Sequence, residues 1–430
     1  MKYHQIDRHL FIKNRSKFTA QMKPKSIAIF NSNDIYPVSA DSTLPFAQHR
    51  DIFYLSGIDQ EESILLLCPD APYEHQKEML FLKETSELIA IWEGTKLTKE
   101  EAFAVSGIKT VHWLQDFEKV LFEMMTYTDT MYINTNEHYR SHVETETREA
   151  RFVKWWKEKY PAHQVAKSNP ILQRLRSVKE SEELDLIQNA CNITEMGFRR
   201  ILSFVKPNVM EYEIEAEFIH EFIRNRSKGF AYTPIIASGN NANVLHYIEN
   251  SKQCKAGDLI LLDVAAEYAN YSSDLTRTIP VSGRYSERQR AVYNAVLRVK
   301  NEATKMLTPG TLWKQYHTEV GKIMTSELLG LGLLDKVDVQ NENPEWPAYK
   351  KYFMHGTSHH MGLDTHDYGI LTEPMQANMV FTVEPGIYIP EEGFGIRIED
   401  DVVIQKTGDP FNLMKNIPIE VEEIEDLMNS

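Results

Sequence analysis

The sequence predicts an N-terminal α/β domain followed by an α+β domain in which helices pack on a curved, mostly antiparallel sheet. Three observations support this fold class. The chain has 430 residues, which suits two domains of about 100–200 residues each. In the first part of the chain, strand-like runs alternate with helical stretches, which is typical of an α/β layer. After Ser177 the order helix, helix, strands occurs twice, which suggests an internal duplication.

The first part carries short apolar runs and helical patterns in alternation. Strands are predicted at Ser26–Phe30, Ile52–Leu55, Ser63–Cys68 and Glu78–Leu82, and helices at Thr98–Val105 and Leu114–Met125. The turn-like Lys167–Pro170 favours a boundary near Ile171–Ser177. We therefore expect domains at 1–172 and 177–430.

The second part is read from its apolar periodicity. Ser177 or Ser181 could cap a helix whose apolar residues recur three and four apart from Leu184 to Val205. The later elements follow in order: a helix through Ile214, Phe218 and Phe222 that ends at Gly229, β-rich segments at Thr233–Ala237 and Asp258–Val281, a helix from Ser286 with Gln289 in a capping box, a helix from Thr311, and β-rich segments from Tyr352 to Gln405.

Composition and charge exclude several classes of protein. Hydrophobic residues make up 42 % and charged residues 25 %, which argues against disorder. The net charge of −15 makes the chain a poor partner for nucleic acid. Residues up to Arg176 include 23 basic and 24 acidic side chains, whereas the rest includes 24 and 38. Most of that excess reads as a solvated surface, but some carboxylates are candidate ligands.

Cysteine usage and the N-terminus bear on the compartment. Cys68, Cys191 and Cys254 form no C-x-x-C motif, which fits a reducing environment. Charges are scattered through Met1–Phe18 without an apolar core, so we expect no signal peptide. The longest apolar runs are far too short to span a bilayer. We expect a soluble, cytoplasmic protein that does not contact membranes.

Two aspartates lie in a predicted strand pair. Asp263 lies inside the buried run Leu259–Val264, and Asp274 lies at the same distance beyond a turn at Tyr268–Ala269. In a hairpin with that turn, the two side chains face each other with Cβ atoms about 4.5–5.5 Å apart. Two anions so close in an apolar strand repel each other unless a cation lies between them.

A second pair of carboxylates repeats this pattern. Glu384 and Glu399 are symmetric about the turn-like Glu391–Gly393, so they could oppose each other across another hairpin. Pro385–Gly386 must interrupt the first strand, which leaves room for a bulge.

Histidines cluster between the two pairs. Because Gly, Thr and Ser are weak helix formers, we expect the segment from His355 to His359 to be extended. Residues four apart share one face of a strand, so His355 and His359 point together and His360 points away. His366 follows seven residues after His359, and His246 stands alone earlier in the chain.

Four carboxylates and a histidine suit divalent ions such as Mn²⁺, Co²⁺ or Fe²⁺ better than ions that seek thiolates. Five ligands, two of them bridging, are natural for a pair of metals. In hydrolases, paired metals clamp a hydroxide and polarise the scissile carbonyl. Each residue also has an ordinary explanation, since a lone Asp or His is usually structural and Glu399–Asp401 could be a solvated turn. Together, those explanations fit carboxylates inside two apolar strand pairs poorly.

These motifs resemble those of the pita-bread metallopeptidases, and among them the Xaa-Pro aminopeptidases (aminopeptidase P). The likeness spans the second part of the chain through Leu259–Asp263, Ser273–Thr278, His355–His359, Thr382–Gly386 and Ile396–Asp400. Arg50–Gly57 and Ile91–Gly94 are similar, more weakly, to the N-terminal domain shared by aminopeptidase P, prolidase and creatinase. Methionine aminopeptidase shares the catalytic fold but lacks that domain. The resemblance implies a pita-bread domain preceded by a creatinase-like α/β domain.

The resemblance implies a role for each candidate ligand. Asp263 would bind one metal, and His359 and Glu384 the other. Asp274 and Glu399 would bridge both. A metal-bridging water or hydroxide would attack the peptide carbonyl, and Glu384 would move its proton to the leaving nitrogen. The implied cofactor is two divalent ions per chain, first of all Mn²⁺, with Co²⁺, Fe²⁺ and Zn²⁺ as alternatives.

The other candidates would handle the substrate. By resemblance, His246, His355 and His366 match histidines that hold the peptide and stabilise the oxyanion. Arg397 is similar to a residue that pairs with a ligand carboxylate and fixes its orientation, and Tyr388 would assist it.

The implied reaction is hydrolysis of the bond between an N-terminal residue and a following proline. One alternative is a prolidase that cleaves only Xaa-Pro dipeptides, and another is an inactive peptide-binding scaffold on the same fold. Prolidase-like chains carry an arginine before the Thr-Val-Glu-Pro-Gly motif, but Tyr368–Met379 contains no Arg or Lys. Scaffolds in the family lose ligand residues, and all five positions are filled here.

Assembly is also predicted from the resemblance, since N-terminal domains commonly build the oligomer in this family. We expect a homodimer or homotetramer whose interface uses the region before Ser177. The partners expected are peptides that begin with Xaa-Pro, with no nucleic acid.

Overall fold

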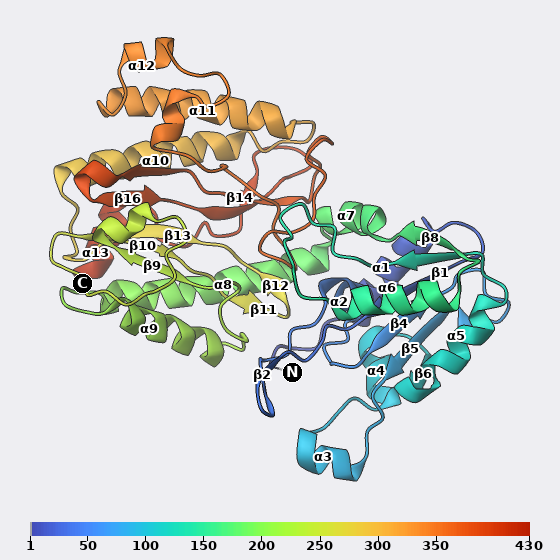
Figure 1. Ribbon diagram of the computed structural model, residues 1–430. Helices are drawn as coiled ribbons and strands as arrows, with labels where there is room; N and C mark the ends of the chain where they lie inside the picture. The colour runs from blue at the N-terminus through green and yellow to red at the C-terminus, as the bar shows by residue number, and fades with distance from the viewer. Residues whose placement is uncertain (1) are drawn as a thin grey trace. The chain divides into compact units, whose positions relative to one another are not determined.

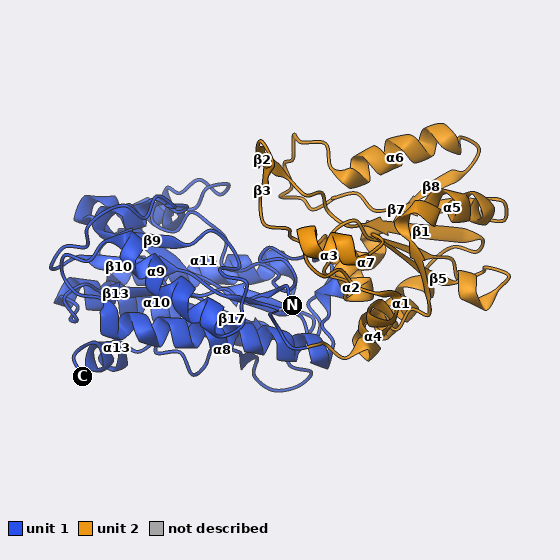
Figure 2. Cartoon of the chain, turned by 90° about the horizontal axis from the view of Figure 1, so that it is seen from below, with its two compact units in different colours: residues 1–4, 176–430 blue, residues 5–175 orange. Residues whose placement is uncertain are grey.

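The computed structural model describes residues 2–430, which form two compact units. The first unit along the chain holds residues 5–175, which are orange in Figure 2, and the second unit holds residues 176–430 with residues 2–4, which are blue. Helix α7 (Asn169–Ser177) contains the division between them. The chain thus runs through an α/β unit and then an α+β unit, in the predicted order.

The first unit is a mixed sheet of six strands with helices around it (Figure 1). The strand order is β6-β5-β4-β1-β7-β8, with antiparallel pairs β5/β4 and β4/β1 and parallel pairs elsewhere. The strands are β1 (Ser26–Asn31), β4 (Ile64–Leu67), β5 (Glu78–Leu82), β6 (Thr110–Trp113), β7 (Thr130–Ile133) and β8 (Gln164–Lys167). The helices are α1 (Arg8–Thr19), α2 (Arg50–Ser56), α3 (Glu87–Glu93), α4 (Lys99–Ser106), α5 (Phe117–Met125) and α6 (Arg148–Lys159), and a small hairpin joins β2 (Pro37–Ser39) to β3 (Ser42–Thr43).

The predicted strand at Ile52–Leu55 is wrong, because these residues lie in helix α2. The His49 side chain accepts the Asp51 N–H at the helix start, and Gly57 ends the helix with φ of 70°. Every side chain from Asp51 to Ser56 is buried. In a short run whose side chains are all buried, apolar residues recur with neither the roughly 3.6-residue period of a helix nor the two-residue period of a strand. Apolar character alone therefore could not separate strand from helix.

The second unit repeats two helices followed by strands, as predicted. The first half comprises α8 (Ser181–Phe204), α9 (Glu211–Arg224), β9 (Ile235–Ser238), β10 (Leu259–Asp263), β11 (Glu267–Tyr268), β12 (Tyr271–Ser272) and β13 (Thr276–Pro280). The second half comprises α10 (Glu287–Lys305), α11 (Trp313–Gly330), α12 (Lys336–Gln340), β14 (Val380–Val383), β15 (Gly386–Ile389), β16 (Phe394–Arg397), β17 (Asp400–Val403), β18 (Phe411–Asn412) and α13 (Val421–Met428). In Figure 1 the strands labelled β9, β10, β13, β14 and β16 lie between α8 and α9 below and α10 and α11 above.

The sequence predicted where two helices of this unit begin or end, and the structure confirms one of these predictions and contradicts the other. The capping box at Ser286 is present, since its hydroxyl accepts the Gln289 N–H at 3.2 Å and the Gln289 side chain accepts the Ser286 N–H at 2.9 Å. The predicted end of α9 at Gly229 is wrong. The helix ends at Arg224, and both the backbone and the side chain of Asn225 donate to the Glu221 carbonyl. Asn225 thus closes the helix before the glycine.

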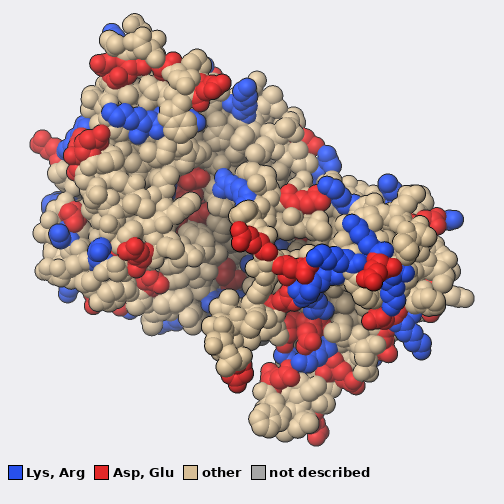
Figure 3. Space-filling view, viewed as in Figure 1, with Lys and Arg blue, Asp and Glu red and all other residues tan. Residues whose placement is uncertain are grey.

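Charged side chains are dense on the visible face of the first unit in Figure 3. On the face shown in Figure 3, basic and acidic side chains alternate closely over this unit, in keeping with its nearly equal numbers of both kinds.

Within residues 2–430, no helix is both long and apolar enough to cross a membrane.

Candidate metal centre

Asp263 and Asp274 belong to the predicted hairpin, but the pairing is shifted by two residues from the expected register. The turn lies at Ala269–Asn270, where φ is 54° and 68°, instead of Tyr268–Ala269. Asp263 therefore pairs with Thr276, and Asp274 precedes that partner by two residues. Because side chains alternate along a strand, the two aspartates still share a face, diagonally instead of directly opposed.

Glu384 and Glu399 stand opposite each other, as predicted. The pairs β14/β17 and β15/β16 follow one continuous register, which aligns these two residues. Pro385 interrupts the first strand between β14 and β15. The Ile398 N–H still donates to the Pro385 carbonyl at 3.3 Å, so the strand continues without a bulge.

Thr276 joins the two carboxylate pairs into one row across the strands. It pairs with Asp263 on one side and with Glu399 on the other, where the Glu399 N–H donates to its carbonyl at 3.0 Å. The Thr276 hydroxyl also donates to a Glu399 carboxylate oxygen at 2.6 Å. The row continues to Glu384, so acidic side chains from both halves of the repeat meet on adjacent strands.

The histidine segment is not helical, as predicted, and it runs beside β14 with bends at His355 and Thr357. The Thr382 N–H donates to the His359 carbonyl at 3.1 Å, and His360 pairs with Phe381. The ring centroids of His360 and Phe381 are 4.3 Å apart. His360 therefore packs into the apolar layer, while His355 and His359 both face Glu384, each 3.8 Å from one of its carboxylate oxygens.

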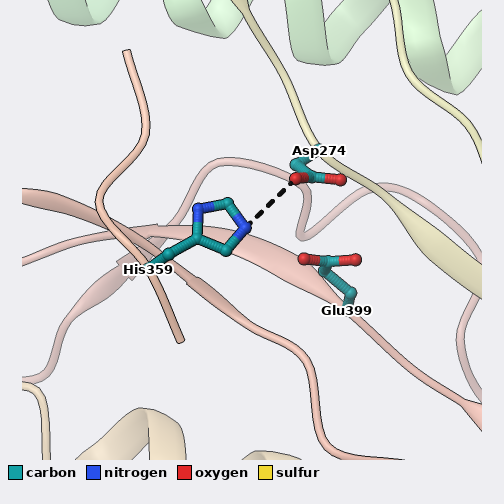
Figure 4. Close-up of side chains that lie close together, drawn as sticks. All are labelled: Asp274, His359 and Glu399. Carbon is teal, nitrogen blue, oxygen red and sulfur yellow. Dashed lines mark ion pairs between the residues drawn. The ribbon is translucent and has the colours of Figure 1, made fainter. Parts of the chain in front are cut away.

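Asp274, His359 and Glu399 form the most compact part of the site (Figure 4). Each offers one ligand atom, and these three atoms lie within 4.8 Å of one another. His359 Nε2 is 3.4 Å from an Asp274 oxygen, and Figure 4 shows the Glu399 carboxylate beneath them. All three residues are buried. The structure thus brings three of the five predicted ligands into one donor set.

Asp263 and Glu384 lie beside this set and have other partners as well. The Asp263 carboxylate accepts from Arg397 at 2.6 Å and from the Tyr232 hydroxyl at 2.7 Å. A second nitrogen of Arg397 donates to the Tyr388 hydroxyl at 2.7 Å, which lies 2.8 Å from His355 Nε2. A chain of hydrogen bonds therefore links a candidate ligand to a candidate substrate histidine.

The other two histidines lie at the exposed edge of the site. The His366 ring stands edge-on to His359, with 4.4 Å between the ring centroids. His246 is exposed on the loop that follows the short helix η3 (Gly239–Asn243). Burial first, then Arg397 and His246, lower the pKa of His355 to about 3, so this imidazole is neutral at neutral pH.

Burial and mutual repulsion raise the pKa values of the clustered carboxyls. Burial raises the pKa of Glu384 to about 7, where nearby carboxylates add to the effect and His359 opposes it. Burial and the same kind of repulsion raise the pKa of Glu399 well above its usual range, and the pKa of Asp263 is raised as well. Negative charge at this site exceeds what its neighbouring cations balance.

The donor set fits a divalent metal. Carboxylate oxygens and an imidazole are ligands that such ions accept, and a cation would offset the repulsion among the acids. His359 Nδ1 lies 3.0 Å from the His360 carbonyl, which requires the proton on Nδ1. Nε2, the other ring nitrogen, faces Asp274 and is the atom that a metal would bind once it is deprotonated.

Sequence reasoning missed three residues that hold the candidate ligands: Tyr232, Thr276 and Asp401. The Asp401 carboxylate accepts the Asp274 N–H at 2.9 Å. Its only sequence signal was the acidic run Glu399–Asp401, for which a solvated turn was one explanation. That explanation is wrong, because all three acids are at most 2 % exposed.

Comparisons with known proteins cover the whole chain. Residues 185–406 match the profile of "Metallopeptidase family M24", and residues 11–132 match "Aminopeptidase P, N-terminal domain". The Xaa-Pro aminopeptidase of Haemophilus influenzae is 33 % identical over 99 % of this chain and 98 % of its own. Aminopeptidase PepP of Pseudomonas aeruginosa superposes with a TM-score of 0.89 at 30 % identity, covering 99 % and 98 % of the two chains. Aminopeptidase P of Escherichia coli with the inhibitor Pro-Leu gives a TM-score of 0.88 at 31 % identity over 99 % of both chains.

Proposed function

Because the chain belongs to metallopeptidase family M24 and is a metal-dependent aminopeptidase, we propose that its substrates are peptides with proline at the second position. It would release the N-terminal residue from such peptides. The observation that carries this proposal is the buried donor set of Asp274, His359 and Glu399 within 4.8 Å. The solved relatives are aminopeptidases P, one of them with Pro-Leu bound, which disfavours the prolidase alternative.

The proposed ligands are the five acidic and imidazole side chains singled out in the sequence: Asp263, Asp274, His359, Glu384 and Glu399. We propose two divalent ions per chain, with Mn²⁺ first. Ions held there supply Lewis-acid polarisation of the peptide carbonyl and a lowered pKa for the attacking water. The continuous row of Asp263, Thr276, Glu399 and Glu384 across the strands supports a site wide enough for more than one ion.

Glu384 is the proposed acid and base. Its carboxylate faces His355 and His359 at 3.8 Å, at the side where the histidines for the substrate lie. A carboxylate there can take a proton from the attacking water and give it to the leaving nitrogen. Thr357 accepts the Glu384 N–H through its carbonyl at 2.7 Å, which fixes the backbone of this residue.

The substrate would be held by His246, His355 and His366. His355 is anchored on both ring nitrogens, 2.8 Å from the Gly356 carbonyl and 2.8 Å from the Tyr388 hydroxyl. Because its pKa is low, it would face the peptide as a neutral ring that these two contacts hold in place. Arg397, which contacts both Tyr388 and Asp263, would keep that group and one ligand carboxylate in a fixed relation.

The two units would have separate tasks, with catalysis in 177–430 and assembly in 1–172. Helix α3 supports this, since Leu88, Ile91 and Trp92 are 66 %, 77 % and 81 % exposed and no residue of the helix is buried. Such an apolar face favours contact with a second copy in a homodimer or homotetramer. A cytoplasmic location is supported by three free, buried cysteines.

Substrate length tests the proposed function. We expect a higher kcat/KM for Ala-Pro-Ala than for Ala-Pro in the presence of Mn²⁺, because Tyr368–Met379 offers no basic side chain for the carboxylate of a dipeptide. Ala-Ala-Ala is the control for proline specificity and should be a poor substrate. A clear preference for Ala-Pro would favour prolidase, and cleavage of Ala-Ala-Ala at the rate of Ala-Pro-Ala would contradict the proline specificity.

A further inference from the structure

His366 lies in a segment that no helix or strand holds. Residues 361–370 adopt no regular secondary structure. The Gly362 N–H donates to the Asp364 carbonyl at 3.1 Å, and the Asp367 N–H donates to the His360 carbonyl at 2.9 Å. These bonds fix the two ends of the segment, while His366 itself is exposed. Its edge-on position against His359 therefore depends on side-chain contacts nearby.

Arg176 binds acidic side chains of this segment on both sides of His366. The same guanidinium nitrogen lies 2.7 Å from an Asp364 oxygen and 2.6 Å from an Asp367 oxygen. The guanidinium also stacks over the Tyr368 ring, 4.4 Å from its centroid. The side chain of Arg176 is only 2 % exposed, so its charge is desolvated and its partners are the acids of this segment.

Lys179, three residues after Arg176, also contacts Asp367. Its ammonium lies 3.3 Å from the second oxygen of Asp367, and its side chain is 1 % exposed. The Lys179 N–H donates to the Asn378 carbonyl at 2.9 Å, and Val178 pairs with Met379. The two cations are thereby fastened to the strand region that carries Glu384, through β14.

Gly362 shows how tightly the cluster is enclosed. A Cβ added at this position would lie 2.2 Å from an Asp367 oxygen and 2.8 Å from Lys179 Cε. Only glycine leaves room for that contact. Although burial raises the pKa of Asp367, Arg176 and Lys179 hold it below its usual value, so the cluster is an ionised one.

We propose that Arg176 and Lys179 are positioning residues for catalysis, which hold His366 against His359 through Asp364 and Asp367. This inference rests on the proposed function, in which His366 contacts the peptide. It assigns a task to the ion cluster of Arg176, Lys179, Asp364 and Asp367, none of which is a proposed metal ligand or substrate-binding residue. Its effect should therefore pass entirely through His366.

A double-mutant cycle tests that dependence. Arg176→Lys removes the forked guanidinium but keeps the charge, and we expect kcat/KM for Ala-Pro-Ala to fall about tenfold or more with metal content unchanged. In the His366→Ala background the same substitution should change kcat/KM by less than about twofold. Arg15→Lys is the matched control, because Arg15 is also buried and donates to the Leu55 and Ser106 carbonyls in the other unit. It should leave kcat/KM unchanged.

Equal losses in both backgrounds, or no loss in either, would overturn the proposal. If Arg176→Lys does not fold, Asp364→Asn replaces it, since the Asp364 side chain is 45 % exposed and its loss leaves Asp367 paired. Amide hydrogen exchange over 362–369 provides a readout without substrate, and it should accelerate in the Arg176 or Asp364 variant. Unchanged exchange would count against positioning, whereas wild-type protein that fails to cleave Ala-Pro-Ala would refute only the proposed function.

Discussion

Glu399 and Asp400 are neighbours in the chain, but their carboxylates are balanced in opposite ways. Asp400 contacts Arg277 at 2.6 Å and also the ammonium of Lys300. Although burial raises the pKa of Asp400, these two cations hold it below its usual value. Glu399 accepts the Thr276 hydroxyl and faces other carboxylates, so burial and repulsion raise its pKa well above the usual range.

Burial cannot explain this difference, because the two residues are 2 % and 1 % exposed. The difference lies in whether the chain itself supplies the cation. Around Asp400 the fold supplies Arg277 and Lys300, so this carboxylate stabilises the folded unit. Around Glu399, acids from both halves of the repeat converge, and a cation from solution would balance them. In the proposed function, the same chemical group therefore serves structure at one position and ion binding at the next.

The strongest test of this comparison is Asp274→Asn, which removes a negative charge from the candidate metal site and leaves Asp400 and its two cations intact. We expect the aminopeptidase activity to fall more than about 1000-fold, beyond the 10–100-fold cost of changing a residue behind a ligand. Because one repelling carboxylate is gone, the free energy of unfolding of the metal-free protein should stay the same or rise. Steady-state kinetics and urea unfolding measure both quantities. Retained activity would remove Asp274 from the set of ligands.

The matched substitution at the carboxylate that the fold itself neutralises is Asp400→Asn. It leaves Arg277 and Lys300 buried without their counter-charge, so we expect the free energy of unfolding to fall by about 3 kcal/mol. Urea unfolding of this variant beside Asp274→Asn makes the comparison, since both replace a buried aspartate by asparagine in the same unit. If the two variants were equally stable, the division into structural and ion-binding acids would be wrong.

Metal removal should distinguish wild type from the Asp274 variant by stability alone. A ligand that binds only the folded state at about 100 times its Kd contributes about 2.7 kcal/mol. Chelation should therefore lower the Tm of the wild type by several degrees. Asp274→Asn should show little change, because its site is already disabled. Thermal unfolding with and without EDTA checks this, and equal shifts in the two proteins would place the stabilising metal elsewhere.

The smallest expected effect is on the pH dependence of the free energy of unfolding, and it involves Glu149 in the first unit. This buried acid is hydrogen-bonded to neutral donors. It accepts the backbone N–H and the side-chain amide of Asn31, and burial raises its pKa to about 8. A raised pKa means that the folded state keeps a proton that the unfolded state releases. This acid therefore lowers stability as pH rises from about 4.5 toward 8.

Glu149→Gln mimics the protonated acid, so it should remove this pH dependence. Between pH 6 and pH 7 the wild type should lose about 1 kcal/mol more unfolding free energy than the variant. Urea unfolding of both proteins at the two pH values measures the difference. Parallel pH profiles would show that Glu149 is ionised in the folded protein.

The sequence predicted the carboxylate pairs because strand periodicity is local, and the turns decided how well the register followed. Gly393, with φ of 73°, marks the turn between β15 and β16, and the register of Glu384 and Glu399 was correct. At the other hairpin Ala269 adopts a positive φ without any glycine to signal it. The predicted turn was therefore one residue early.

Contacts between distant parts of the chain could not be predicted. Tyr232 reaches Asp263 from a loop, and Arg176 reaches Asp367 across 191 positions. Neither contact leaves a periodic or local signal in the sequence. The resemblance to a known family indicated the candidate ligands, the histidines and two supporting residues, Arg397 and Tyr388, but it did not indicate the other supporting residues, Tyr232, Thr276, Asp401 and Arg176. Those supporting residues follow only from three-dimensional packing.

The central claim is that Asp274, His359 and Glu399 are the core of a divalent-metal site. Its most direct test is a crystal structure of the protein grown with Mn²⁺, examined by anomalous difference density at a wavelength where manganese scatters strongly. We predict density among these three side chains, with a second peak toward Asp263 if two ions bind. Density at another cluster, or none at these side chains in fully active protein, would contradict the account.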